Sequence, residues 1–385
     1  MTFELRAGII GTGFMGSVHA NAVRAVGGDV SAIAGSSQAS AEAAAAGLGA
    51  RTAAASPEAL IARDDVDVIH ICTPNATHAD LARKAIAAGK PVVCEKPLAT
   101  SVEDAGELTD LADRAGVVTG VPFVYRFYPA VREARDRILR GDAGRLWLLH
   151  GSYLQDWLVG AEATNWRVDS KLGGTSRAFG DIGVHWCDLM EFTTGHRITR
   201  LVAKTSRAYD QRETGGQLLS SVATEDGATL LFETDKGATG SLVVSQVSPG
   251  RKNRLWFSFD GTEASFSFNQ ERPDTLHVGR TESSSEIPVG PQTLTTSGGR
   301  RYAKLPPGHP QGYQDSFNSF VADVYAAIQG QTPEGLPTFR DGLRAALLTD
   351  ALVTSAAQQS WVDVPGTHNP FELLKCSSAA ERQKQ

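Results

Sequence analysis

Short apolar runs alternate with amphipathic stretches over the first 122 residues. Residues 66–72 are β-branched and nearly all apolar, which is typical of a strand buried on both faces of a sheet. Ser101, with Asp104 three residues later, marks a helix start, and Gly89 and Gly116 lie just past two helix ends. We therefore predict strands at 7–10, 30–34, 66–72, 91–94 and 117–121, and helices at 14–26, 40–46, 79–88 and 101–116. This alternation predicts a parallel sheet with helices on both faces.

The rest of the chain is dominated by strand-like runs. After a helix at 132–140, strands are expected at 145–155 and from 199 onward, with turns at Asp226-Gly227, Lys236-Gly237 and Asp260-Gly261 joining antiparallel neighbours. Alternating phenylalanines predict one buried face: Phe257, Phe259, Phe266 and Phe268. Further helices are expected near 181–193 and at 313–328 and 340–358, with an irregular excursion over 281–312. The predicted organisation is an α/β domain (1–122), an α+β domain (123–365) and a polar tail (366–385).

Composition and charge exclude several classes of protein. The 385 residues carry 37 Lys and Arg against 43 Asp and Glu, a net charge of −6, which argues against a general nucleic-acid binder. No apolar run reaches the length of a membrane span, and the first residues run straight into a strand without a secretory signal. The four cysteines (Cys72, Cys94, Cys187 and Cys376) show no close pairing. We expect a cytoplasmic protein with no membrane partner.

A glycine-rich loop follows the first predicted strand and opens the first helix. Gly11 permits a tight turn, Gly13 lets the backbone of the loop approach a pyrophosphate, and Gly16 lets the first helix pack closely on the first strand. The free N–H groups at the helix start would then meet the phosphate charge. We predict a dinucleotide site here, with contacts from Gly11, Gly13, Phe14, Met15 and Gly16.

The end of the second strand leaves the choice of dinucleotide open. A carboxylate there would hold the 2′-hydroxyl of NAD, and an arginine would accommodate the 2′-phosphate of NADP. This chain has Ser36 and Ser37 instead, and a serine can bind either group. We favour NAD slightly and do not exclude NADP.

Chemistry-bearing residues follow two later strands and one helix. Thr73, Pro74, Asn75 and His78 come after one strand and Glu95-Lys96 after another, and ligands bind at such strand ends. Asp181 and His185 lie four residues apart, so a helix would place both on one face. Asp188 is near them, but no second cluster of ligating residues exists, and we predict no metal site.

Taken together, these motifs resemble the glucose–fructose oxidoreductase and inositol dehydrogenase family of sugar oxidoreductases over residues 7–364. The resemblance rests on the glycine loop, the Thr73-Pro74-Asn75 and Glu95-Lys96-Pro97 segments, and Gly173-Gly174 followed by Asp181 and His185. It implies a Rossmann domain joined to a domain with a large, mostly antiparallel open sheet. It also implies hydride transfer between NAD(P) and a hydroxyl-bearing carbon of a sugar or cyclitol, in dimers or tetramers formed through the sheet.

The resemblance also implies roles for three residues. Lys96 is similar to the family's catalytic lysine, His185 and Asp181 complete the site, and the Lys96-Pro97 bond is expected to be cis. Alcohol oxidation needs a base with a pKa near operating pH, and histidine starts near 6.5 whereas lysine starts near 10.4. We assign proton transfer to His185, orientation and polarisation to Lys96, and hydroxyl binding to Asp181, although the first two roles are interchangeable at this stage.

Sugar sites combine aromatic faces with hydrogen-bonding groups. The residues expected to contact substrate are Lys96, Arg126, Tyr153, Trp166, Arg167, Asp181, His185 and Tyr313. Convergence of two cations among Arg126, Arg167, Lys171 and Arg177 would indicate an anionic sugar. Residues 153–157 and 361–364 are similar to the branch that oxidises pyranose and anhydrosugar substrates such as levoglucosan.

Two alternatives to a simple dehydrogenase remain. An NAD-dependent oxidative glycoside hydrolase would oxidise the sugar, eliminate the aglycone, add water and return the hydride. A dinucleotide-sensing protein would keep the glycine loop, but it would not need Lys96, Asp181 and His185 together.

Overall fold

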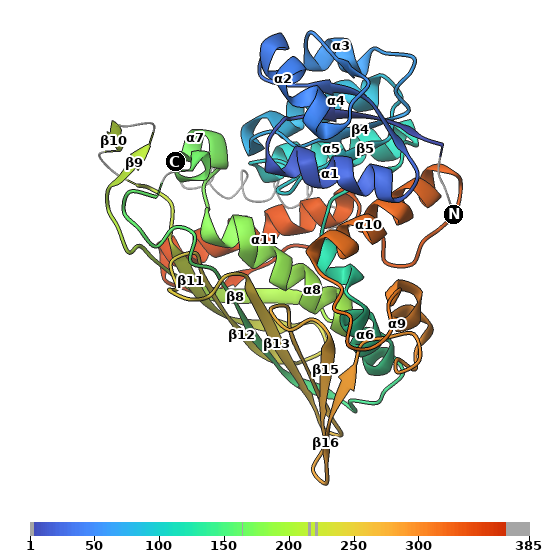
Figure 1. Ribbon diagram of the computed structural model, residues 1–385. Coiled ribbons are helices and arrows are strands. Elements are labelled where there is room, and N and C mark those ends of the chain that lie inside the picture. The colour runs from blue at the N-terminus through green and yellow to red at the C-terminus, as the bar shows by residue number, and fades with distance from the viewer. Residues whose placement is uncertain (1–3, 164, 215–216, 220–221, 367–385) are drawn as a thin grey trace.

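The computed structural model describes residues 4–163, 165–214, 217–219 and 222–366, and these form two sheets with associated helices (Figure 1). The predicted tail and Cys376 therefore lie outside the described residues, apart from residue 366. The three described cysteines, Cys72, Cys94 and Cys187, are free thiols, as expected.

The first sheet is parallel and six-stranded, in the order β3-β2-β1-β4-β5-β6. Its strands are β1 Arg6–Ile10, β2 Asp29–Ala34, β3 Thr52–Ala53, β4 Val68–Ile71, β5 Val92–Cys94 and β6 Thr119–Gly120. Its helices are α1 Phe14–Ala25, α2 Gln38–Leu48, α3 Pro57–Ile61, α4 His78–Ala87 and α5 Val102–Ala115. The order is that of the Rossmann fold, which confirms the predicted fold class.

Both faces of this sheet are buried because its strands alternate between two apolar clusters. On β4, Val68 belongs to a cluster with α1, whereas Ile69 and Ile71 belong to one with α3, α4 and α5. The helices start and stop where the sequence indicated: Ser101 caps α5 through the N–H of Asp104, and Gly116 ends it with φ +65°. The short elements β3 and α3 were not predicted, because two to five residues carry little periodicity.

The second sheet has nine strands, in the order β16-β15-β14-β13-β7-β12-β11-β8-β17, and a separate hairpin joins β9 to β10. Among the described strands of this sheet, only β7 and β12 pair in parallel. The strands are β7 Leu146–Leu154, β8 Ile198–Ser206, β9 Arg212–Thr214, β10 Gln217–Leu219, β11 Gly227–Thr234, β12 Thr239–Ser245, β13 Arg254–Gly261, β14 Ser265–Asn269, β15 Thr275–Gly279, β16 Ser284–Pro288 and β17 Val362–Asp363. The predicted large, mostly antiparallel sheet is confirmed.

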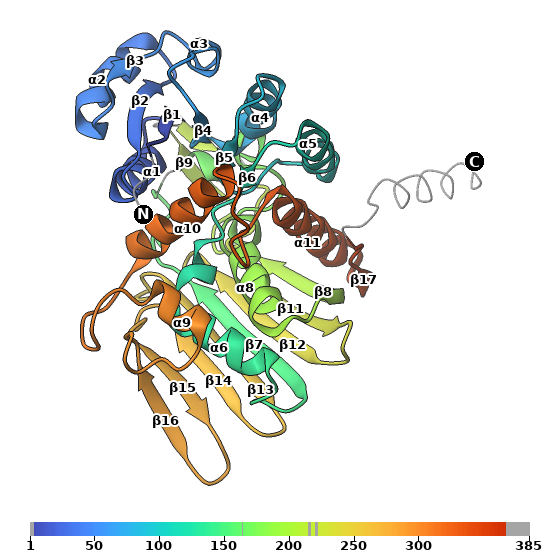
Figure 2. The same ribbon diagram turned by 90° about the vertical axis from the view of Figure 1, so that its right-hand side faces the viewer.

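Helices cover one face of the second sheet and leave the other open (Figures 1 and 2). These helices, with the short helical turns around them, are η2 Val124–Phe127, α6 Pro129–Leu139, η3 Trp166–Val168, α7 Ser170–Gly173, the π-helical turn η4 Phe179–Gly183, α8 Val184–Thr194, α9 Ser297–Tyr302, α10 Tyr313–Ile328 and α11 Phe339–Gln358. The four alternating phenylalanines of β13 and β14 are at most 1% exposed on the covered face, as predicted.

Two sequence predictions in this region are wrong. Asp226-Gly227 is not a hairpin turn, because the Asp226 carboxylate is buried against Arg177 and accepts from Arg212 Nη2 at 2.8 Å, and Gly227 opens β11. The 281–312 segment is not wholly irregular, since it contains the edge strand β16 and the helix α9. The side chains of β16 are mostly exposed, so they carry no apolar alternation.

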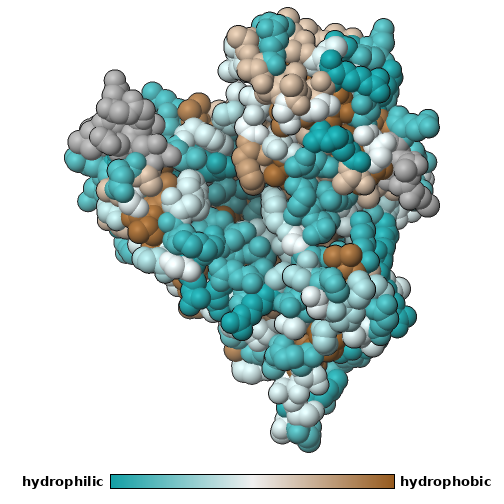
Figure 3. All heavy atoms as spheres, viewed as in Figure 1, coloured by the Kyte–Doolittle hydropathy of each residue, from teal (hydrophilic) through white to brown (hydrophobic). Residues whose placement is uncertain are grey.

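The helix α10 returns from the far end of the sequence to cover the first sheet. Its Phe317, Phe320 and Val324 are fully buried in the same cluster as α1 and β4. The helix α11 packs along α5. The two sheets are thereby joined, and the surface is hollowed between the first domain and the region of α7 (Figure 3).

Candidate functional site

The glycine loop between β1 and α1 has the geometry of a phosphate cradle. Gly11 has φ +119°, and a Cβ there would lie 2.5 Å from the carbonyl oxygen of Cys72. A Cβ at Gly16 would lie 2.2 Å from the carbonyl oxygen of Gly11, whereas one at Gly13 would meet no atom within 4 Å. No side chain caps the start of α1, so its first N–H groups are available to a phosphate.

A cavity of about 720 Å³ extends from this loop to the ends of β4 and β5. Arg167, Trp166 and Asn165 close it from the second domain. The predicted cofactor contacts that border it are Gly11, Gly13, Phe14, Met15, Ser36, Thr73, Pro74, Asn75, His78, Glu95 and Lys96. Gly16 lies behind the loop, and the Ser37 hydroxyl accepts from the backbone N–H of Ser40 as the N-cap of α2. The residues present fit a dinucleotide.

His78 and Asn75 hold the walls of this cavity together. The His78 ring nitrogens lie 2.7 Å from the carbonyl oxygen of Pro97 and 2.9 Å from that of Thr73. Asn75 Nδ2 donates to the carbonyl oxygen of Gly173 at 2.9 Å. The Lys96-Pro97 bond is cis, as the family resemblance implied.

Lys96 and Asp181 form an ion pair between the two domains. Lys96 Nζ donates to Asp181 Oδ1 at 2.6 Å and to its carbonyl oxygen at 2.8 Å. Arg167 Nε donates to the same carboxylate at 3.3 Å, and Gln246 Nε2 donates to Oδ2 at 2.8 Å. Burial acts to raise the pKa of Asp181, but the charges of Lys96 and Arg167 outweigh it and hold that pKa well below its usual range. Asp181 is therefore an ionised hydrogen-bond acceptor.

His185 adjoins this pair, and none of the described residues hydrogen-bonds its buried Nδ1. The residue is 8% exposed. The rings of Tyr125 and Phe123 pack edge-on against it, with centroids 5.1 and 5.6 Å away. Burial, followed by the charge of Lys96, lowers the pKa of His185 well below 6.5. The imidazole is therefore neutral at physiological pH and can accept a proton.

Tyrosines and an amide extend the site beyond His185. The Tyr153 hydroxyl contacts that of Tyr125 and donates to Asn253 Oδ1 at 2.8 Å. The Tyr313 ring lies 6.3 Å from that of Tyr125. Neither Gln246 nor Asn253 was singled out from the sequence. Each stands beside a strand, Gln246 after β12 and Asn253 before β13, and only that position hints at a role.

Arg126 was predicted to contact substrate, and the structure places it elsewhere. Its guanidinium is buried and donates to Asp188 Oδ2 at 2.8 Å and to Asp341 Oδ1 at 2.6 Å, in a separate cavity of about 350 Å³. Lys171 is exposed, and Arg177 is buried against Asp226. Of the four cations considered, only Arg167 borders the dinucleotide cavity, so the condition for an anionic sugar is not met.

We expect Arg126→Met to destabilise the fold by about 3–5 kcal/mol, because it leaves the Asp188 carboxylate buried without its partner and removes the guanidinium from Asp341. Urea denaturation measures this loss. Arg340→Met is the control, since its ion pair with Asp113 is half-exposed and should contribute less than about 1 kcal/mol. Equal losses in the two variants would contradict a structural role for Arg126.

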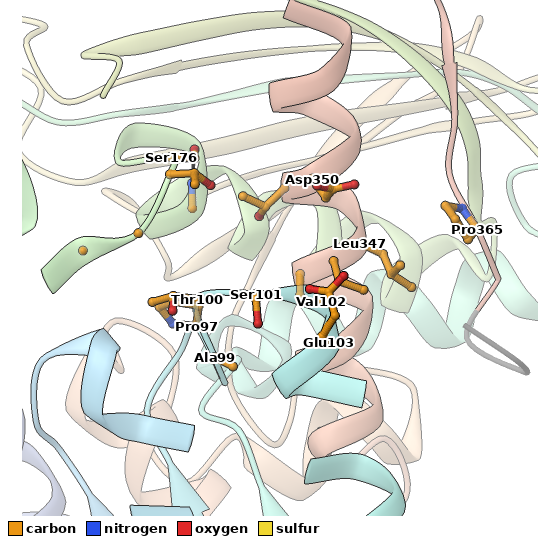
Figure 4. A pocket seen from close by; sticks show the side chains of 16 residues that line it. Pro97, Ala99, Thr100, Ser101, Val102, Glu103, Ser176, Leu347, Asp350 and Pro365 are labelled. Atoms are coloured by element: carbon orange, nitrogen blue, oxygen red, sulfur yellow. Dashed lines mark hydrogen bonds between the residues drawn. The ribbon is translucent and has the colours of Figure 1, made fainter. Parts of the chain in front are cut away.

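A second interdomain cavity, of about 410 Å³, lies between the segment after Pro97 and α11 (Figure 4). Thr100, Ser101 and Glu103 border it from the first domain, and Asp350 from α11. Burial and the charge of Glu103 raise the pKa of Asp350. Lys96 borders the dinucleotide cavity and not this one, whereas Asp181 and His185 line neither. Because Asp181 is paired with Lys96, we place the catalytic candidates at the first cavity.

Among the described residues, no group of three or more His, Cys, Asp or Glu side chains is arranged to hold a metal ion. Nor does that part of the chain contain a helix long and apolar enough to cross a membrane.

Comparison with known proteins shows the same two-part organisation. The family model for the GFO/IDH/MocA oxidoreductase family with an NAD-binding Rossmann fold matches residues 5–123, and that for the GFO/IDH/MocA C-terminal domain matches residues 131–267. Levoglucosan dehydrogenase from Pseudarthrobacter phenanthrenivorans is 32% identical, over 94% of this chain and 98% of that protein. 1,5-Anhydro-D-fructose reductase from Ensifer adhaerens is 30% identical, over 81% and 93% respectively. A solved structure of levoglucosan dehydrogenase with NADH and levoglucosan superposes with a TM-score of 0.87 at 32% identity, covering 94% of this chain and 99% of that one.

Proposed function

This chain belongs to the GFO/IDH/MocA oxidoreductase family, and on that premise we propose that it oxidises an uncharged pyranose-type sugar at a hydroxyl-bearing carbon. It is an NAD(P)-dependent dehydrogenase of the CH–OH group. The observation that carries the proposal is the Lys96–Asp181 pair beside neutral His185, at the end of the dinucleotide cavity. A protein that only senses dinucleotides has no use for this group.

We assign the following roles in the reaction. The glycine loop and Ser36 would hold NAD, which would supply the hydride acceptor. His185, which burial and Lys96 keep neutral, takes the hydroxyl proton. Lys96 donates to the substrate oxygen as negative charge develops on it, and Asp181 accepts from a neighbouring hydroxyl while Gln246 and Arg167 keep it in position.

Charge and polar groups around the site support a neutral substrate. The two cations at Asp181, Lys96 and Arg167, are already paired with its carboxylate. The groups beyond His185 are the hydroxyls of Tyr125 and Tyr153 and the amide of Asn253, which suit sugar hydroxyls. The similarity to levoglucosan dehydrogenase over nearly the whole chain supports an anhydropyranose in particular.

A substrate panel tests this proposal. We expect NADH formation with levoglucosan and other neutral pyranoses, a lower rate with NADP, and little turnover of uronates. Arg167→Ala should reduce the rate on every sugar alike, because Arg167 acts through Asp181. A selective loss on uronates would contradict the neutral-sugar proposal. Release of nitrophenol from nitrophenyl glycosides without net NADH formation would identify an oxidative glycoside hydrolase instead.

The open face of the second sheet supports a homodimer or homotetramer. Large apolar side chains are exposed on it, including Leu231 at 52% on β11 and Val243 at 43% on β12. Patches of this kind usually mark interfaces. We expect Leu231→Glu with Val243→Lys to shift the mass in light scattering towards the monomer, whereas Leu305→Glu, at an exposed leucine outside both sheets, should leave it unchanged. An unchanged mass in the double variant would exclude this face.

A further inference from the structure

A line of buried polar side chains crosses the first domain behind the dinucleotide cavity. The Glu95 carboxylate borders the cavity, accepts from the backbone N–H of Lys96 at 3.1 Å, and lies 3.2 Å from His19 Nε2. His19 Nδ1 lies 2.9 Å from His70 Nδ1, and His70 Nε2 lies 3.1 Å from the Tyr325 hydroxyl. His19, His70 and Tyr325 are fully buried, on α1, β4 and α10 respectively.

Hydrogen-bond pairing restricts the protons along this line. The ionised Glu95 carboxylate can only accept, so His19 Nε2 carries a proton. With one N–H on His19, its Nδ1 accepts from His70 Nδ1–H and His70 Nε2 is the acceptor towards the Tyr325 hydroxyl; with two, His19 Nδ1–H donates to His70 Nδ1 and His70 Nε2–H donates to that hydroxyl. In both arrangements every contact joins one donor to one acceptor, and His19 donates to Glu95.

The charge states of His70 and Glu95 agree with either arrangement. Burial, and then the neighbouring His19, lower the pKa of His70 well below 6.5, which keeps it neutral. Burial acts to raise the pKa of Glu95, but the hydrogen bond and charge of His19 and the charge of Lys96 outweigh it, so that pKa is lowered. Without such partners, a carboxyl group that is only 6% exposed would tend to take up a proton.

We propose that His19 and His70 are positioning residues of the dehydrogenase, which together with Tyr325 keep Glu95 fixed and ionised at the catalytic end of the dinucleotide cavity. That end is marked by Lys96, the next residue in the chain. A fixed negative charge there favours the positively charged nicotinamide of NAD⁺ over the neutral ring of NADH, most strongly where water is excluded. The buried line thereby biases the site towards oxidation of the sugar.

The test compares His19→Leu with His19→Gln. The glutamine amide keeps one donor and one acceptor, as the neutral imidazole has, whereas leucine keeps neither. Calorimetry without sugar measures the dissociation constants of NAD⁺ and NADH separately. We expect the leucine variant to lose about tenfold in its preference for NAD⁺ over NADH, equivalent to about 1.4 kcal/mol, and the glutamine variant to stay within about twofold of the parent. Tyr325→Phe, at the far end of the line, should shift the ratio in the same direction by a smaller factor.

An unchanged ratio in a folded His19→Leu protein would overturn the proposal, and so would an equal loss of affinity for both dinucleotides. If His19→Leu does not fold, Tyr325→Phe provides the comparison, and an unchanged ratio there overturns the proposal. Long-range ¹H–¹⁵N spectra of the histidine-labelled parent should show His70 neutral and His19 protonated on Nε2. An imidazolium at His70, or a His19 ring without a proton on Nε2, would contradict the proposed line.

Discussion

Lys96→Met is expected to lower kcat for sugar oxidation by about 10²–10⁴-fold. Lys96 Nζ reaches Asp181 across the domain boundary and is the cation that would meet negative charge on the substrate oxygen. Methionine has a side chain of similar length and apolar character to the lysine methylenes, so the packing around position 96 is largely kept. Steady-state rates at saturating sugar, together with NADH binding, separate chemistry from binding.

Lys171→Met is the matched control for this loss. Lys171 lies on α7 and its side chain is exposed. We therefore expect the Lys171→Met variant to oxidise sugar at the rate of the parent protein. A Lys96→Met rate within about threefold of the parent would remove Lys96 from the mechanism. A loss confined to NADH affinity would make Lys96 a binding residue only.

His185→Phe is the second large effect that we expect, with kcat falling by about 10²–10⁴-fold as the proton acceptor is lost. Phenylalanine keeps a flat ring against Tyr125 and Phe123. The fall in kcat would therefore result from the missing ring nitrogens and not from altered packing. Unfolding curves of parent and variant check that the fold is retained. A rate near that of the parent would transfer the role of base to Lys96.

The pH profile gives an independent check on His185. A base must be neutral, so activity falls as pH drops through its pKa, which burial and Lys96 lower well below 6.5. The acidic limb of kcat/KM should therefore lie below pH 6.5 in the parent. Lys96→Met removes one lowering influence while Asp181 still acts to raise this pKa, so the limb should move upward, towards 6.5. A parent limb above pH 6.5 would contradict the assignment.

The sequence predicted those parts of the site that depend on local pattern. The glycine loop, the ends of β4 and β5, and the Asp181–His185 spacing each follow from a short segment whose element type is readable. The π-helical turn that carries Asp181 was not foreseen, because four-residue spacing alone does not distinguish it from an α-helix.

Long-range pairing accounts for what the sequence could not show. Arg126, next to aromatic residues, had the pattern of a ligand contact, but its acidic partners stand 62 and 215 positions further along the chain. Gln246 reaches Asp181 because the end of β12 packs against the π-helical turn, 65 positions away in the sequence, and neither segment alone encodes that contact. Sequence patterns identify a charged group but not the distant residue that neutralises it.

The return of α10 to the first sheet affects how the protein is assembled during synthesis. The apolar side chains of α1 and β4 on that face, including Val23 and Val68, are covered by a helix that ends at Ile328. The first 122 residues emerge from the ribosome long before that helix is synthesised, so one face of the nascent Rossmann sheet is uncovered during that time. Completion of the dinucleotide-binding half, although it is encoded first, is therefore among the last events in the biogenesis of the chain.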